Sequence, residues 1–93
     1  MTDEVGRSVV YEARFDEEAA AIDSNVHRMD ETLRYVEKVL ALDPEFGIQT
    51  KVPLIWMAPV VFHAPTSSGA QGASIFYTFD DERVRCLSIR RDW

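Results

Sequence analysis

The chain opens on a stretch in which apolar and polar positions alternate. Residues 7–15 place their apolar side chains on one side of an extended chain, namely Val9, Tyr11, Ala13 and Phe15. A period of two is typical of a half-buried β-strand. Asp16 then offers a helix N-cap, and Glu17 and Glu18 fall in the first turn, where negative charge is favourable. The pattern predicts a strand over residues 7–15 and a helix that begins at residue 16.

The apolar positions next recur three or four residues apart. They form one stripe, which consists of Ile22, Val26, Met29, Leu33, Val36 and Leu40. This spacing predicts an amphipathic helical segment with its stripe against the core. Asp23-Ser24-Asn25 are poor helix formers, so one long helix and a hairpin of two helices both stay open, and a break or kink here is preferred. Asp43-Pro44 ends the segment, because the residue before a proline is pushed away from helical geometry.

The second half of the chain carries the patterns of β-strands. Residues 51–63 are largely apolar but contain Pro53 and Pro59, which cannot donate to a sheet ladder, so we expect one edge strand or two short ones. The Pro, Ser and Gly content of residues 64–72 predicts a loop. Residues 73–79 and 84–93 flank an acidic turn and predict a closing hairpin. The expected fold is α+β: a strand, a kinked helix or helical hairpin, then an antiparallel sheet of about three strands.

Composition places this pattern in one small acidic domain. Ninety-three residues with 46% hydrophobic content fit a single domain over residues 1–93. Ten basic residues against 16 acidic ones give a net charge of -6, which argues against nonspecific nucleic-acid binding. The acidic excess lies in the first 50 residues, with 12 acidic and 5 basic side chains. Four arginines crowd the closing hairpin and are interpreted as a solvated strand face or, alternatively, as a phosphate- or partner-binding surface: Arg83, Arg85, Arg90 and Arg91.

Further sequence features indicate where the protein resides. Cys86 is the single cysteine, so there is no internal disulfide, and its place in an apolar strand predicts a buried core thiol. The N-terminus lacks the apolar run of a signal peptide, and no stretch approaches the roughly 20 apolar residues that a membrane-spanning helix needs. We expect a soluble cytoplasmic protein without membrane association.

The order of these elements resembles the RelE/ParE superfamily of type II toxins, small domains that run strand, helical hairpin, then curved antiparallel sheet. The resemblance covers residues 9–91. It rests on Phe15-Asp16-Glu17 after the opening strand, on residues 26–42 with the Asp43-Pro44 stop, and on the aromatic strand, acidic turn and apolar strand that close the chain. It implies a toxin–antitoxin function and an antitoxin-like protein partner.

RNA-cleaving members of that superfamily use basic side chains on the central strands. Here residues 54–63 carry no Lys or Arg, and Ala73-Ser74 stand where many members have Tyr-Arg. RNA cleavage by 2′-hydroxyl attack needs a base, an acid and cations around the phosphate. We therefore expect cleavage to be lost or reduced. If the chain were instead a ribosome-dependent mRNA endonuclease, His63 or Tyr77 would transfer protons and the arginines would contact phosphate.

The leading hypothesis is thus a diverged RelE/ParE-like protein that acts through a protein partner. Apolar residues near the proline-broken edge and at the end of the chain are candidates for the partner surface, with the core as the alternative location of the first three: Trp56, Met57, Phe62 and Trp93. A homodimer that binds an unknown ligand is a further alternative. Asp23, His27 and Glu31 share a helix face but indicate a solvated surface, so no metal and no cofactor is expected.

Overall fold

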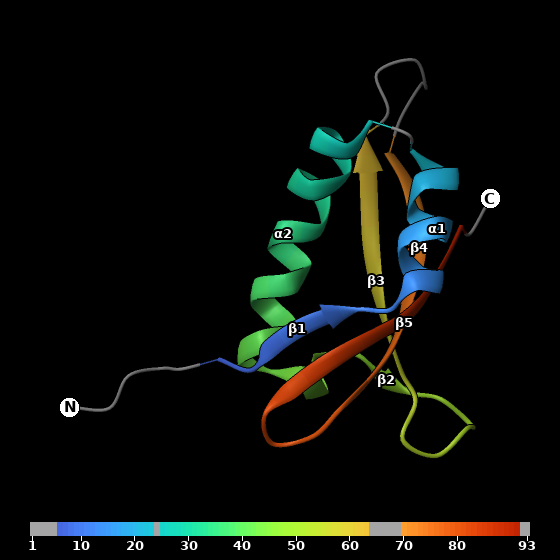
Figure 1. The fold of residues 1–93 in the computed structure, drawn as a ribbon. Coiled ribbons are helices and arrows are strands. Elements are labelled where there is room, and N and C mark those ends of the chain that lie inside the picture. The colour runs from blue at the N-terminus through green and yellow to red at the C-terminus, as the bar shows by residue number, and fades with distance from the viewer. Residues whose placement is uncertain (1–5, 24, 64–69, 92–93) are drawn as a thin grey trace.

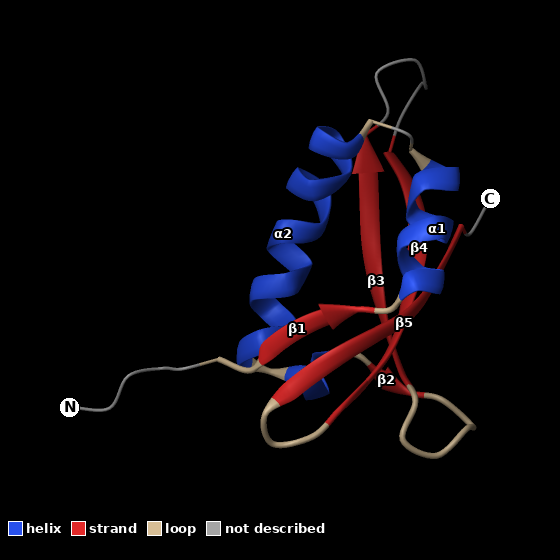
Figure 2. Cartoon of the chain, in the orientation of Figure 1, coloured by secondary structure: helices blue, strands red, loops and turns tan. Residues whose placement is uncertain are grey.

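The computed structural model describes residues 6–23, 25–63 and 70–91, which form one five-stranded sheet with two helices packed on one of its faces (Figures 1 and 2). The elements in chain order are β1 Ser8–Tyr11, α1 Ala13–Ile22, α2 Val26–Leu42, the short 3-10 helix η1 Pro44–Phe46, β2 Ile48–Gln49, β3 Trp56–His63, β4 Ala70–Phe79 and β5 Arg83–Arg91. The sheet order is β1-β5-β4-β3-β2, with β1 parallel to β5 and all other pairs antiparallel. The predicted α+β class is confirmed. No helix in the described part of the chain is long and apolar enough to cross a membrane.

The first strand is shorter than predicted. β1 ends at Tyr11, and α1 begins at Ala13 with Glu12 in the N-cap position, so the prediction of a strand to Phe15 and a cap at Asp16 is wrong. The chain turns where the Glu12 N–H donates to the Cys86 carbonyl at 3.0 Å. Phe15 and Ala19 are then buried one helical turn apart. The period-two pattern over residues 9–15 was ambiguous, because Phe15 also begins the buried stripe of α1.

The helical segment is a hairpin of two helices. α1 ends at Ile22 and α2 begins at Val26, and the Asn25 side chain caps α2 by accepting from the Arg28 N–H at 3.0 Å. Asp23 supports the same corner, since its carboxylate accepts the Arg28 side chain at 2.5 and 2.8 Å. Four members of the predicted stripe are buried, namely Met29, Leu33, Val36 and Leu40. Ile22 is partly buried, and the Val26 side chain lies outside the described atoms.

Strand β3 forms most of one sheet edge. β2 pairs only with Trp56 and Met57, so the rest of β3 has no strand on its outer side among the described residues. Pro59 falls in this part of β3, where a missing N–H is tolerated. The predicted edge strand is confirmed, although it starts at Trp56 and the two-residue β2 was not predicted. The predicted loop is shorter than expected: its last residues, 70–72, belong to β4, and residues 64–69 lie outside the described part.

The predicted closing hairpin is present and contains a bulge. The β4–β5 register shifts between Phe76 and Tyr77, which pair with Ser88 and Cys86, so Leu87 is an extra residue in β5. Cys86 and Ile89 can therefore both face the helices, three residues apart. Burial raises the pKa of the Cys86 thiol to about 12, in agreement with an inert core position.

Glu18 on α1 closes the part of the β5 edge that β1 does not reach. β1 ends opposite Cys86. Beyond that point, Glu18 Oε1 accepts the Ser88 hydroxyl at 2.7 Å and the Ile89 N–H at 3.1 Å, and Arg14 Nε lies 3.4 Å from Oε2. Burial by itself would raise the pKa of Glu18, but the hydrogen bonds from Ser88 and Ile89 and the nearby Arg14 lower it below its ordinary value. The carboxylate thus stabilises a strand edge that would otherwise be free to pair.

Replacing Glu18 by glutamine should weaken this contact and flatten the dependence of stability on pH. Because the folded-state pKa is lowered, the stabilisation is present above the unfolded-state pKa of about 4.3 and is lost as the pH falls through the folded value. We expect Glu18→Gln to cost about 1 kcal/mol at pH 7 and less at pH 3. Urea unfolding at both pH values measures this. Glu17→Gln, an exposed neighbour, should stay within about 0.5 kcal/mol; equal losses in both variants would contradict the assignment.

Candidate functional site

The bulge in β5 brings three of the four predicted arginines to one face of the sheet. Val84, Cys86 and Ile89 are buried toward the helices, so Arg83, Arg85 and Arg90 alternate onto the opposite face, here called the outer face. Arg91 follows Arg90 and therefore alternates to the helix side of the sheet. All four are exposed, and Arg85 Nη2 lies 3.2 Å from Glu12 Oε2. Without the bulge, Arg90 would have shared the helix side with the core.

The proton-transfer candidate Tyr77 is not on this face. Tyr77 is fully buried among the core residues, its hydroxyl donates to the Pro44 carbonyl at 2.5 Å, and it accepts the Gly47 N–H at 3.2 Å. Burial raises the pKa of Tyr77. Arg85 pairs opposite Thr78, the next residue, which points the other way. The sheet therefore separates Tyr77 from Arg83, Arg85 and Arg90. His63 ends β3, and its side chain lies outside the described atoms.

Two of the predicted partner-surface residues are described, and both are half-buried. The Trp56 ring packs 5.6 Å from the Phe79 ring, at the border of the core. Met57 pairs opposite Phe76. The Phe62 side chain and Trp93 lie outside the described part of the structure. Trp56 thus serves mainly in packing, and larger exposed apolar surface lies elsewhere.

That surface is a groove between α2 and the free edge of β3, here called the α2–β3 groove. It has a volume of about 580 Å³, and most of its lining is apolar: Tyr35, Val36, Val39, Phe46, Val60 and Val61. Tyr35 is 73% exposed and Phe46 is 51% exposed. The sequence held one signal of this groove: Tyr35, next to the buried Val36, places a large aromatic side chain on the polar side of the amphipathic helix α2. Tyr35 could be assigned to a groove only once the fold placed β3 beside α2.

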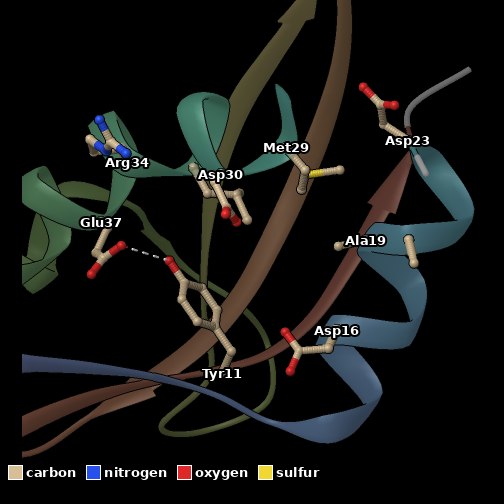
Figure 3. Close-up of a pocket in the computed structure, with 10 residues that line it drawn as sticks. Tyr11, Asp16, Ala19, Asp23, Met29, Asp30, Arg34 and Glu37 are labelled. Atoms are coloured by element: carbon tan, nitrogen blue, oxygen red, sulfur yellow. Dashed lines mark hydrogen bonds between the residues drawn. The ribbon is translucent and has the colours of Figure 1, made fainter. Parts of the chain in front are cut away.

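A second concavity lies between the two helices and is here called the interhelical cleft (Figure 3). It measures about 430 Å³. Tyr11 forms part of its floor, and apolar side chains of both helices line it further in, including Ala19, Met29 and Leu33. One arginine, Arg34, lines the cleft. Four carboxylates surround the cleft: Asp16, Asp23, Asp30 and Glu37. Sequence reasoning did not identify this cleft, since its acids come from two helices whose relative placement only the fold defines.

Hydrogen bonding and burial set the charge state within the cleft. The Tyr11 hydroxyl donates to Glu37 Oε2 at 3.2 Å. Burial, and then the nearby charge of Glu37, raise the pKa of Tyr11, so its hydroxyl remains a neutral donor. The hydrogen bonds from Arg28 and from the Asn25 N–H lower the pKa of Asp23, which stays ionised and paired.

Neither concavity is arranged as a metal centre. Among the described residues, no group of three His, Cys, Asp or Glu side chains could hold a metal ion. His27 Nε2 lies 3.1 Å from Glu31 Oε1, and both side chains are largely exposed, as predicted for a solvated helix face. The prediction that Asp23 shares this face is wrong, because Asp23 follows the end of α1 and its largely buried carboxylate pairs with Arg28.

Comparison with known proteins adds little to this geometry. No family model and no curated protein matches the chain. Among solved structures, a crystal structure of the E. coli DinJ–YafQ toxin–antitoxin complex contains a chain with a TM-score of 0.46 and 13% identity, covering 94% of this chain and 93% of that one. A second crystal structure of the E. coli DinJ–YafQ complex gives a TM-score of 0.45 and 15% identity over 91% and 92% of the two chains. Likeness at this level carries no functional argument, so the function is inferred from the grooves and side chains themselves.

Proposed function

We propose that this chain is a diverged RelE/ParE-like component of a toxin–antitoxin-type pair, that it acts through a protein partner, and that RNA cleavage is lost or reduced. The observation that carries the proposal is the α2–β3 groove with its exposed aromatic residues. The sequence resemblance supplies the class of partner, an antitoxin-like protein.

The groove has the composition of a protein-binding surface. Exposed aromatic side chains beside an apolar hollow are typical anchors of protein interfaces, because they bury much area at low cost in conformational entropy. Tyr35 and Phe46 come from α2 and η1, and Val61 from β3 adds a third apolar side chain that is half exposed. Covering them would remove apolar surface from water on three elements at once.

The free edge of β3 favours a helical partner segment over an extended one. Adding a strand to β3 would run past Pro59, which has no N–H to donate. An amphipathic helix satisfies its own backbone groups and needs only apolar contact from the groove. We therefore propose that an amphipathic helix of the partner lies beside α2 and covers the α2–β3 groove.

The loss of RNA cleavage is supported by the placement of the candidate residues. The Tyr77 hydroxyl is buried and bonded within the core, and Arg85 is paired with Glu12. Tyr77, as a candidate proton donor, and Arg85, as a candidate phosphate contact, are thus on opposite sides of the sheet, whereas cleavage needs such groups around one phosphate.

The test is binding of the protein encoded by the reading frame next to this gene. The purified neighbour is titrated into the chain by calorimetry, and Tyr35→Gln is compared with Leu42→Gln. Both residues are exposed on α2, at 73% and 61%, but only Tyr35 lines the groove. We expect Tyr35→Gln to weaken binding at least tenfold, about 1.4 kcal/mol, and Leu42→Gln to change it less than twofold.

Three results would overturn the proposal. The first is no binding of either neighbouring gene product, and the second is equal effects of the two variants. The third is a homodimer in sedimentation that Tyr35→Gln dissociates, since a second copy would then occupy the groove. Primer extension on translated messages tests the other part, because cleavage on induction of the chain would show that the nuclease activity persists.

A further inference from the structure

We propose that the interhelical cleft receives an arginine side chain of the protein partner. This inference rests on the proposed function and adds the chemistry of a second contact on the partner. The cleft combines an apolar interior with an acidic rim, which matches a side chain that has an aliphatic stem and a cationic head.

Carboxylates approach the cleft from two helices. Figure 3 shows Asp16 on α1 and Glu37 on α2 directed toward Tyr11 from opposite sides, with Asp30 above. Within the described residues, no cation lies in ion-pair distance of these three acids. Asp23 differs, because Arg28 already compensates its charge. The cleft therefore has negative charge that the described part of the fold leaves uncompensated.

The interior of the cleft suits the rest of an arginine. Met29, Leu33 and Ala19 provide apolar surface for the three methylene groups. The Tyr11 ring borders the same space, and its hydroxyl is held by Glu37, so a planar guanidinium would lie near an aromatic ring while it donates to the acids around it. Arginine fits better than lysine, since its five donors can reach acids on several sides, whereas lysine has three.

Arg34 is the resident cation that would compete for this place. It stands on the rim in Figure 3, it is exposed, and no ion pair to a described carboxylate joins it to the cleft. One arginine against the three carboxylates that Arg28 does not compensate leaves the cleft acidic in any case. The surplus agrees with the first 50 residues, which hold 12 of the 16 acidic side chains.

The inference is tested on the chain alone with small peptides. N-acetyl-Ala-Arg-Ala-amide is titrated into the 15N-labelled protein and followed by NMR, beside the same peptide with citrulline, which keeps the shape of arginine but is neutral. We expect saturable shifts centred on Ala20, Asp30 and Arg34, which all line the cleft, with a dissociation constant on the order of millimolar. The citrulline peptide should bind at least fivefold more weakly.

Matched variants locate the contact. Asp16→Asn with Asp30→Asn should weaken arginine-peptide binding at least fivefold. Glu17→Gln with Asp81→Asn removes the same charge from exposed positions outside the cleft, and should change binding less than twofold. Equal binding of the arginine and citrulline peptides would overturn the inference, and that comparison needs no variant. Equal effects of the two double variants would overturn it as well.

The peptide experiment separates this inference from the proposed function. Arginine binding in the cleft without any complex with the neighbouring gene product would support the cleft chemistry and count against the partner assigned above. A complex that depends on Tyr35, with no discrimination between arginine and citrulline by the free chain, would leave the proposed function standing and remove the arginine contact.

Discussion

Replacing Phe15 by alanine should destabilise the protein by about 4 kcal/mol, the largest effect that we expect from a single substitution in this chain. Phe15 is fully buried, it stacks 5.0 Å from the Tyr11 ring, and it lies between α1 and the sheet in the main cluster of buried residues. Truncation removes the transfer free energy of a whole ring and leaves a cavity, and large aromatic-to-alanine changes typically cost about 3–5 kcal/mol. Urea unfolding monitored by tryptophan fluorescence measures the change.

Two further variants make the Phe15 prediction specific. Phe15→Leu keeps most of the buried volume and should cost less than half as much. Tyr35→Ala removes an aromatic ring that is 73% exposed and should cost less than about 1 kcal/mol. A loss in Phe15→Ala as small as that in Tyr35→Ala would contradict the burial of Phe15 in the core.

Gly47→Ala should cost about 3 kcal/mol for a reason that is spatial and not conformational. Gly47 has a φ of -78° and a ψ of -164°, an extended backbone conformation that any residue can adopt. A methyl group there would meet the Met57 carbonyl oxygen at a contact that real Cβ atoms do not make, and would lie 2.6 Å from the Tyr77 hydroxyl. The Met57 carbonyl is part of the β3 backbone, so it cannot move without disturbing the sheet. The measurement is again urea unfolding.

A double variant separates the two contacts of Gly47. Tyr77→Phe leaves the Gly47 N–H and the Pro44 carbonyl without this partner and should cost about 1–2 kcal/mol by itself. If the Met57 carbonyl dominates, Gly47→Ala should remain costly in the Tyr77→Phe background. A cost that disappears there would instead assign the clash to the hydroxyl. No loss of stability in Gly47→Ala at all would contradict the packing of η1 against the sheet.

Local sequence patterns predicted the element types better than their boundaries. The hairpin turn formed where predicted because the signal is local: the Asp80 carboxylate accepts the N–H groups of Glu82 and Arg83 at 2.8 and 2.9 Å. The helix break formed where Asn25 caps α2. The end of β1 did not follow from the pattern, because Phe15 fits the period of two of the preceding residues and also begins, with Ala19, the buried stripe of α1.

The candidate sites were less predictable than the fold, since each unites elements that are distant in the chain. The arginines of β5 were visible as a cluster, but the face that three of them share depends on the bulge at Leu87, which allows Cys86 and Ile89 both to reach the core. The α2–β3 groove needs residues near position 35 beside residues near position 60. No pattern within one segment reports that proximity.

The amino-acid sequence by itself thus determined the order of the main strands and helices, a weak point of the helical segment at Asp23-Ser24-Asn25, the turn chemistry and the acidic character of the first half, because caps, prolines and hydrophobic periods act over a few residues. Only the tertiary structure decided where β1 stops, that Tyr77 is a core residue bonded to Pro44, and that Asp16, Asp30 and Glu37 surround one cleft. Those outcomes depend on which distant surfaces are buried together, and that is a property of the whole packed chain.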